Sequence, residues 1–175
     1  AGSLVDSLPQ MLVWLREALR TVGPDERFAI VFFKSGRVIE TDPPGMIEPT
    51  DRMINALSNA WLDPEAAPVL PSGRSDPGTA IAKVLSYQPT DLYFLSDESF
   101  GFSEGSTTKQ QAIRQVEQAI GETKVRVHGV QFFYRNGESA LETLAGRYDG
   151  TFEFVKEKVI ESEGDSDLID AIRDE

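Results

Sequence analysis

An apolar run that ends in a hydroxyl and a carboxylate is the feature of this sequence that could do chemistry. Residues 92–95 are all apolar, and Ser96 and Asp97 follow directly, just before a turn. A continuous apolar run is typical of a parallel strand covered on both faces. In open α/β sheets, ligands bind beyond the carboxyl ends of such strands. The sequence therefore predicts that Asp97 lies at a binding site, although a strand-end Asp can also simply cap a loop or helix.

The elements that must position Asp97 follow from hydrophobic periodicity. Helical spacing of apolar residues predicts helices over about 8–22, 53–61, 77–85, 113–120 and 141–145. Apolar blocks predict strands over 28–33, 37–40, 92–97, 125–133 and 151–155. This alternation predicts an α/β fold: a doubly wound, mostly parallel sheet with helices on both faces and one antiparallel edge strand.

Length and composition indicate one domain, which we place at 1–156. The acidic remainder, 157–175, carries Leu168, Ile169 and Ile172 at helical spacing, which leaves a short helix and a disordered tail both open. Prolines and glycine between 63 and 77 predict a long irregular connection ahead of the third helix.

The charge balance excludes some partners. A net charge of -12 repels a phosphate backbone, so we expect no nucleic-acid partner. The absence of cysteine excludes thiol nucleophiles and Cys-ligated metals and leaves the compartment open. No apolar run is long enough for a membrane segment. His128 is the only histidine and lies in an apolar strand, so we expect neither a His-based triad nor a multi-His zinc site.

The order of these elements and several local patterns resemble the von Willebrand factor type A (VWA) domain. The resemblance covers residues 1 to about 155, and its motifs are the FAIVFFKSGRVIE hairpin, the SGRSDPGTAIAKVL loop, and the LYFLSDES, VRVHGVQFF and LETLAGRYDGTFEFV segments. The family's first strand ends in Asp-x-Ser-x-Ser, and residues 1–4 look like the last part of that motif. We therefore expect the family's first strand and its Asp just before residue 1.

The resemblance implies a metal-ion-dependent adhesion site with Mg²⁺ above the carboxyl edge of the sheet. Carried over residue by residue, its ligands are Ser3, Ser75 and Asp97, whereas Ala1 stands where the family has a first Ser. In the family, an acidic side chain of a partner protein completes the Mg²⁺ coordination. Mg²⁺ needs only one or two carboxylates beside hydroxyls and waters. Ser75 could instead cap the helix that begins near residue 77.

Two loops flank this edge and supply the partner-binding residues that we expect. Glu98 departs from the family's Thr-Asp-Gly by placing a second carboxylate beside Asp97. Two aromatic residues in the following loop could anchor a partner or could tuck under the loop. The expected contact residues are Arg74, Asp76, Glu98, Phe100 and Phe102.

The sequence therefore favours a protein-binding module without catalysis. Such a module could recognise a partner carboxylate through a bridging Mg²⁺ ion. A first alternative is a metal-free degenerate VWA scaffold in a larger assembly, whose missing strand comes from other sequence or another chain. A second is a Mg²⁺-dependent phosphoryl-transfer enzyme using Asp97 and Glu98, against which stands the absence of any Gly-rich phosphate loop.

Overall fold

Helices and strands alternate along the chain as the periodicity predicts. The computed structural model describes residues 4–34, 37–63, 77–97, 109–133, 137 and 139–156. Its elements are α1 (Leu4–Leu19), β1 (Val31–Lys34), β2 (Arg37–Glu40), α2 (Asp51–Ala60), α3 (Pro77–Leu85), β3 (Asp91–Ser96), α4 (Lys109–Ile120), β4 (Arg126–Phe132), α5 (Ala140–Arg147) and β5 (Phe152–Val155). The predicted α/β class is confirmed.

Among the described residues, the strands form two sheets. β1 and β2 form an antiparallel hairpin, with Phe33 opposite Val38. β3, β4 and β5 form a parallel sheet, with β4 in the middle. No hydrogen-bonded pairing joins β1 to β3 in the described part of the chain. The predicted mixture of parallel strands and an antiparallel pair is therefore present, but not as one continuous sheet.

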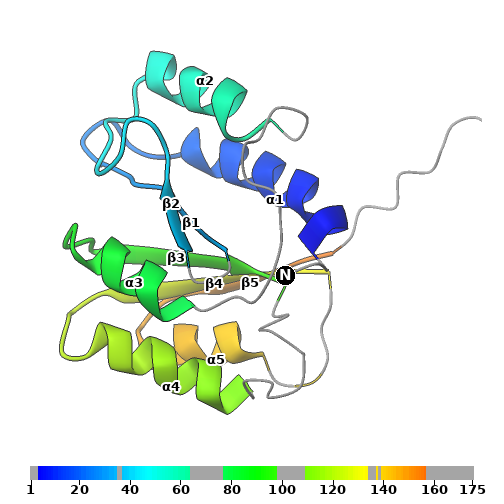
Figure 1. The fold of residues 1–175 in the computed structure, drawn as a ribbon, viewed down its shortest axis with the longest axis vertical. Helices are drawn as coiled ribbons and strands as arrows, with labels where there is room; N and C mark the ends of the chain where they lie inside the picture. Colours follow the sequence, from blue (N-terminus) through cyan, green and yellow to red (C-terminus); the bar gives the residue numbers. More distant parts are fainter. Residues whose placement is uncertain are drawn as a thin grey trace, which may run out of the picture.

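Helices cover both sides of the strands (Figure 1), with α1 and α2 on one side and α3, α4 and α5 on the other. Leu92 and Phe94 of β3 and Val127 of β4 point into a buried cluster with α3, α4 and α5. On the opposite side, the ring of Trp14 in α1 meets that of Phe132 in β4 edge to face at 6.2 Å. None of the described helices is long and apolar enough to cross a membrane.

Most element boundaries agree with the sequence, and the differences have local causes. Thr50 caps α2, accepting a hydrogen bond from the Met53 amide at 3.3 Å. α1 begins at Leu4, about four residues before the predicted start. Pro9 lies in its second turn, where the missing amide removes only one hydrogen bond.

β1 begins three residues later than the apolar block suggests. Phe28, the first residue of that block, instead forms an isolated bridge with Ile47, and both backbone hydrogen bonds of the bridge are made. The partner of Phe28 therefore lies outside the hairpin, and β1 is only four residues long.

Close packing of α5 on the parallel sheet depends on Gly129 in the middle of β4. A Cβ added at Gly129 would lie 2.7 Å from the Cβ of Leu141 and 2.9 Å from its carbonyl oxygen. Leu141 is fully buried. Because Gly129 has no side chain, α5 packs closer to β4 than a larger residue at this position would allow.

We expect Gly129→Ala to lower the free energy of unfolding by about 1–3 kcal/mol, because α5 must move away from β4. The measurement is chemical denaturation followed by circular dichroism. Gly146→Ala in α5 is the matched control: a Cβ there meets nothing within 4 Å, so better helix propensity should stabilise by up to about 1 kcal/mol. Equal effects of the two substitutions would contradict this packing.

Candidate interaction site

Asp97 lies where the sequence places it, directly after the last residue of β3. The residue is only 3% exposed, and the preceding Ser96 is 7% exposed. Ser96 and Asp97 each interact with other residues, so neither is an isolated polar group. A buried carboxylate at the carboxyl end of a parallel strand is the position that binding sites of open α/β sheets use.

The remaining predicted site residues lie outside the described part of the chain. This holds for Ser3, Arg74, Ser75, Asp76, Glu98, Phe100 and Phe102. Their convergence on Asp97 therefore stays a prediction. Within the described residues, no group of three or more His, Asp or Glu could hold a metal ion. One carboxylate is not a magnesium site on its own.

A second candidate site is the region between β1 and β3, here called the strand gap, where no backbone pairing joins the two sheets among the described residues. β1 pairs only with β2, and β3 pairs only with β4, within the described residues. Their backbones lie farther apart than those of the paired strands. Across the gap, the rings of Phe33 and Phe94 meet at 5.8 Å, inclined by 66°.

Helix α1 closes the strand gap on one side. Its buried Leu12 shares an apolar cluster with Phe32 of β1. Trp14, two residues later, contacts Phe132 of β4 and donates a hydrogen bond from Nε1 to Glu153 of β5 at 3.3 Å. Because it reaches from β1 to β4 and β5, α1 passes over the strand gap.

Helix α3 closes the strand gap on the other side. It contacts both strands of the hairpin, and Val84 packs on the same cluster as Phe33 and Phe94. A segment bound in the strand gap would therefore lie between two helices, as a central strand of an α/β sheet does.

A polar cluster fixes the hairpin to α3. Tyr87 donates a hydrogen bond to the Glu40 carboxylate, and Lys83 Nζ lies 3.0 Å from the same carboxylate. The hydrogen bond from Tyr87, more than that from Lys83, lowers the pKa of Glu40 against the effect of burial. Lys83 also lies over the Tyr87 ring, 5.0 Å from its centre. These contacts hold β2 in place without any pairing to β3.

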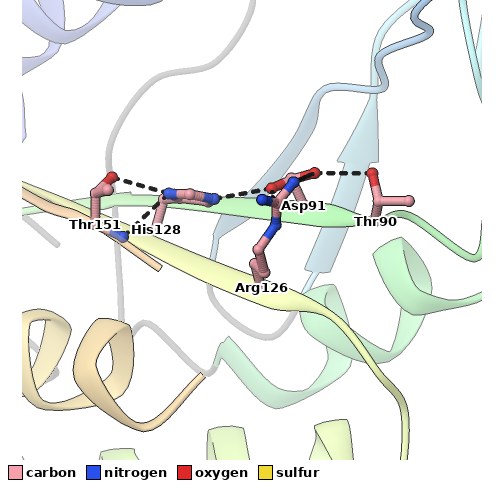
Figure 2. A network of polar contacts seen from close by, with 5 residues as sticks. All are labelled: Thr90, Asp91, Arg126, His128 and Thr151. Carbon is pink, nitrogen blue, oxygen red and sulfur yellow. Dashed lines mark hydrogen bonds and ion pairs between the residues drawn. The ribbon is translucent and has the colours of Figure 1, made fainter. Parts of the chain in front are cut away.

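A row of polar side chains crosses the parallel sheet on the face away from α3, α4 and α5 (Figure 2). Asp91 of β3 receives His128 Nε2 at 3.0 Å and Arg126 Nε at 2.8 Å on one oxygen. Its other oxygen receives Arg126 Nη2 at 2.9 Å and Thr90 Oγ1 at 2.8 Å. Thr151, just before β5, contacts His128 Nδ1 through Oγ1 at 2.9 Å. The row ties β3, β4 and the start of β5 together.

Thr151, His128 and Asp91 thus line up as a hydroxyl, an imidazole and a carboxylate, which the sequence prediction of no His-based triad did not foresee. Two sets of contacts favour a structural role for these three residues over a catalytic one. The backbone amide of Thr151 donates to His128 Nδ1 at 3.1 Å, so the lone pair that a general base needs is already engaged. Both carboxylate oxygens of Asp91 are bound by Arg126.

The exposed ring of Tyr93 covers His128. The two rings stack at 4.5 Å between centres and 13° between planes, while Tyr93 is 57% exposed and His128 is 8% exposed. Since the Thr151 amide donates to Nδ1, His128 carries its proton on Nε2 and donates to Asp91. His128 therefore links Asp91 to Thr151 beneath the ring of Tyr93.

No single segment of the sequence predicts the row of polar side chains from Thr151 to Asp91. Asp91 and Thr151 are 37 and 23 residues from His128. A usable signal was the polar residue at the start of each of two apolar strands, Asp91 and Arg126, which parallel pairing places opposite each other.

No protein-family model matches the chain, and no curated protein matches it either. The interpretation of its function therefore depends on the residues and geometry described above.

The stability of the folded chain at acid pH should depend on the contacts of Asp91. Burial raises the pKa of Asp91, but hydrogen bonds from Arg126, His128 and Thr90 outweigh burial and bring that pKa to about 2. The folded pKa is below the unfolded value, so the unfolded chain binds more protons between pH 5 and 2. The stabilisation, about 2 kcal/mol, is therefore present above pH 5 and is lost as pH falls toward 2.

Asp91→Asn should lower the free energy of unfolding at pH 7 and weaken its pH dependence between pH 5 and 2, measured by urea titration at each pH. Asp25→Asn, at an exposed loop carboxylate, is the control and should leave the profile near that of the unsubstituted chain. Superimposable profiles for Asp91→Asn and Asp25→Asn would contradict the assignment.

Proposed function

We propose that this chain is a protein-interaction domain that accepts an extended peptide segment in the strand gap. The observation that carries the proposal is that β1 and β3 each pair on one side only, within the described residues, while α1 and α3 enclose the space between them. A strand bound there would join the hairpin and the parallel sheet. The result would be the doubly wound, VWA-like sheet that the sequence predicts.

The physical basis is the main-chain hydrogen bonding of strand edges. An edge strand presents a row of amide and carbonyl groups that an added strand can satisfy. Two such edges on either side of one segment offer hydrogen bonds on both of its sides. Binding would also cover apolar surface beneath α1 and above α3, which adds the hydrophobic contribution that edge pairing alone lacks.

The segment can come from further sequence of the same protein or from another chain. Where another chain supplies the segment, the domain acts as a scaffold in a larger assembly; with either source, binding needs neither metal nor catalysis. The acidic balance of the chain, -12 overall, supports a protein rather than a nucleic acid as partner.

A second candidate is the recognition of a partner carboxylate through Mg²⁺ at Asp97. The position of Asp97 at the carboxyl end of β3 and its burial favour it. Asp97 would hold the ion together with Ser3 and Ser75, and Glu98, Arg74, Asp76, Phe100 and Phe102 would flank the partner. Mg²⁺ would supply a bridge between two acidic groups that otherwise repel.

A phosphoryl-transfer enzyme using Asp97 and Glu98 stays the alternative from a different class. The binding proposal predicts no turnover of a generic phosphate ester with Mg²⁺. It also predicts no ester hydrolysis by Thr151, because His128 Nδ1 is engaged by the Thr151 amide.

The strand-gap proposal predicts binding of a designed extended peptide, Ser-Lys-Val-Ala-Val-Ala-Val-Ala-Lys-Ser. With the ¹⁵N-labelled chain, amide shifts should concentrate in β1 and β3, and their hydrogen exchange should slow by about ten-fold or more. The same peptide with a central proline lacks a needed amide and should not bind. Shifts confined to the outer edges of β2 or β5, or no shifts at all, would overturn the proposal.

The magnesium candidate predicts a Mg²⁺-dependent change at the carboxyl end of β3. In a Mg²⁺ titration followed by NMR, the amides of Ser96 and Asp97 should shift, and Asp97→Ala should abolish the shift. Asp63→Ala, at another described carboxylate, is the control. An unchanged titration in Asp97→Ala would remove this candidate and would leave the strand-gap proposal untouched.

A further inference from the structure

We infer that residues 166–175 dock as an amphipathic helix on the parallel sheet, over the exposed ring of Tyr93. The occupant of this surface is a segment of the same chain. The inference goes beyond the proposed function, because it concerns a face of β3, β4 and β5 and not the edges of β1 and β3.

The two faces of the parallel sheet are covered unequally. Toward α3, α4 and α5, Leu92 and Phe94 are 7% and 5% exposed, whereas Tyr93 between them, on the opposite face, is 57% exposed. Arg126 and Thr151 on the face of Tyr93 are exposed as well. Parallel strands are normally buried on both faces, so the surface around Tyr93 suits a covering element.

Helix α1 lies on the face of Tyr93 and contacts the carboxyl-terminal half of the strands. Trp14 meets the ring of Phe132 and bonds Glu153 of β5. Alternation along β4 places Phe132 and His128 on one face, and Tyr93 is paired with His128. Because Tyr93 stays exposed, the amino-terminal half of this face is uncovered within the described part of the chain.

The chain leaves the sheet on the same side as this uncovered surface. The Gln10 side chain in α1 donates a hydrogen bond from Nε2 to the carbonyl oxygen of Lys156 at 2.9 Å. Lys156 directly follows β5, so the residues after it begin beside α1. Those residues, 157–175, lie outside the described part of the chain.

The residues after Lys156 are numerous enough to return over the sheet. An extended chain spans about 3.3 Å per residue, so residues 157–165 reach up to about 30 Å. β4 has seven residues. A strand of that length spans only about 23 Å. The connection can therefore reach Tyr93 and leaves residues 166–175 for about 15 Å of helix.

The sequence of this segment has the pattern of a helix with one apolar side. Gly164 and Ser166 are typical turn and N-cap residues, and they precede the apolar stripe. The apolar stripe consists of three residues at helical spacing, Leu168, Ile169 and Ile172. Docking on the uncovered face removes these three side chains and the Tyr93 ring from water, which is the driving force.

The acidic side chains of the segment determine which side faces the sheet. Helical geometry puts Asp167, Asp170 and Asp174 on the side opposite the apolar stripe. The sheet face carries the exposed Glu153, so carboxylates turned toward it would meet a like charge. The apolar stripe therefore faces Tyr93, and the carboxylates face solvent.

Paramagnetic relaxation by a spin label tests the docking directly. The chain has no cysteine, so Arg173→Cys, next to the apolar stripe, gives one site for a nitroxide. In the ¹⁵N-labelled full chain, amides of Tyr93, Arg126 and Thr151 should lose most of their intensity relative to the reduced label. Amides of α4, beyond the sheet, should keep theirs. Losses concentrated in β1, or no localised loss, overturn the inference.

A mixed sample separates docking within one chain from docking between two copies. Chain that is ¹⁵N-labelled and carries no nitroxide is combined with ¹⁴N chain that carries it. Docking within one chain predicts no loss of intensity in this sample. The same pattern of losses here would assign the surface to a second copy and would overturn the inference.

Substitutions in the apolar stripe test the cause of docking. Leu168→Ser together with Ile172→Ser should lower the ratio of docked to free segment by at least about ten-fold, because buried apolar area is lost. The intensity of the Tyr93 amide should then recover. Val159→Ser, at an apolar residue outside the stripe, is the matched control and should leave the losses unchanged. Equal effects in the two variants contradict the inference.

Tyr93→Ser tests the sheet side of the contact. It should also release the segment, so the intensities of the Arg126 and Thr151 amides should recover. Met46→Ser removes another exposed apolar side chain, 39% exposed, and is the control that should keep the losses. Circular dichroism verifies that each variant folds. Unchanged losses in folded Tyr93→Ser overturn the assigned position of the segment.

Discussion

The edges of β1 and β3 are the constraint on which this structure depends. Backbone amide and carbonyl groups of a strand need partners, and a central strand normally finds them on both sides. Here each of the two strands pairs on one side within the described residues. The helices nevertheless take the positions that they would have around a continuous sheet, with α1 over one face and α3 under the other (Figure 1). The helices are therefore arranged as they would be if a further strand completed the sheet.

Side-chain contacts hold the two sheets where strand pairing does not. Glu40, Tyr87 and Lys83 fix the hairpin to α3, and the ring contact of Phe33 with Phe94 joins it to the parallel sheet. Within the parallel sheet, Asp91 and His128 link the amino-terminal halves of the strands. These are side-chain contacts, and none of them is a backbone pairing between β1 and β3. They preserve the geometry of the strand gap, so a binding segment would not first have to assemble its own site, which reduces the ordering cost of binding.

The sequence predicts local structure well because periodicity is a local property. Each described helix and strand was expected within a few residues, and the position of Asp97 after a strand was predictable because it directly follows an apolar run. The division into two sheets could not be predicted, since pairing between β1 and β3 depends on residues about 60 positions apart and leaves no mark in either strand. The row from Thr151 to Asp91 was missed for the same reason. The ring contact of Phe33 with Phe94 was not predictable either, because it joins strands of two different sheets.

Hydrogen exchange of the free chain tests the central claim, that β1 and β3 are open toward each other, most directly. Measured by NMR, amides of β4, which is paired on both sides, should be the most protected among the strands. Amides of β1 and β3 that face the strand gap should exchange faster by about a hundred-fold or more. Protection of β1 and β3 equal to that of β4, with backbone contacts between them, would show a continuous sheet in the free chain and would contradict the account.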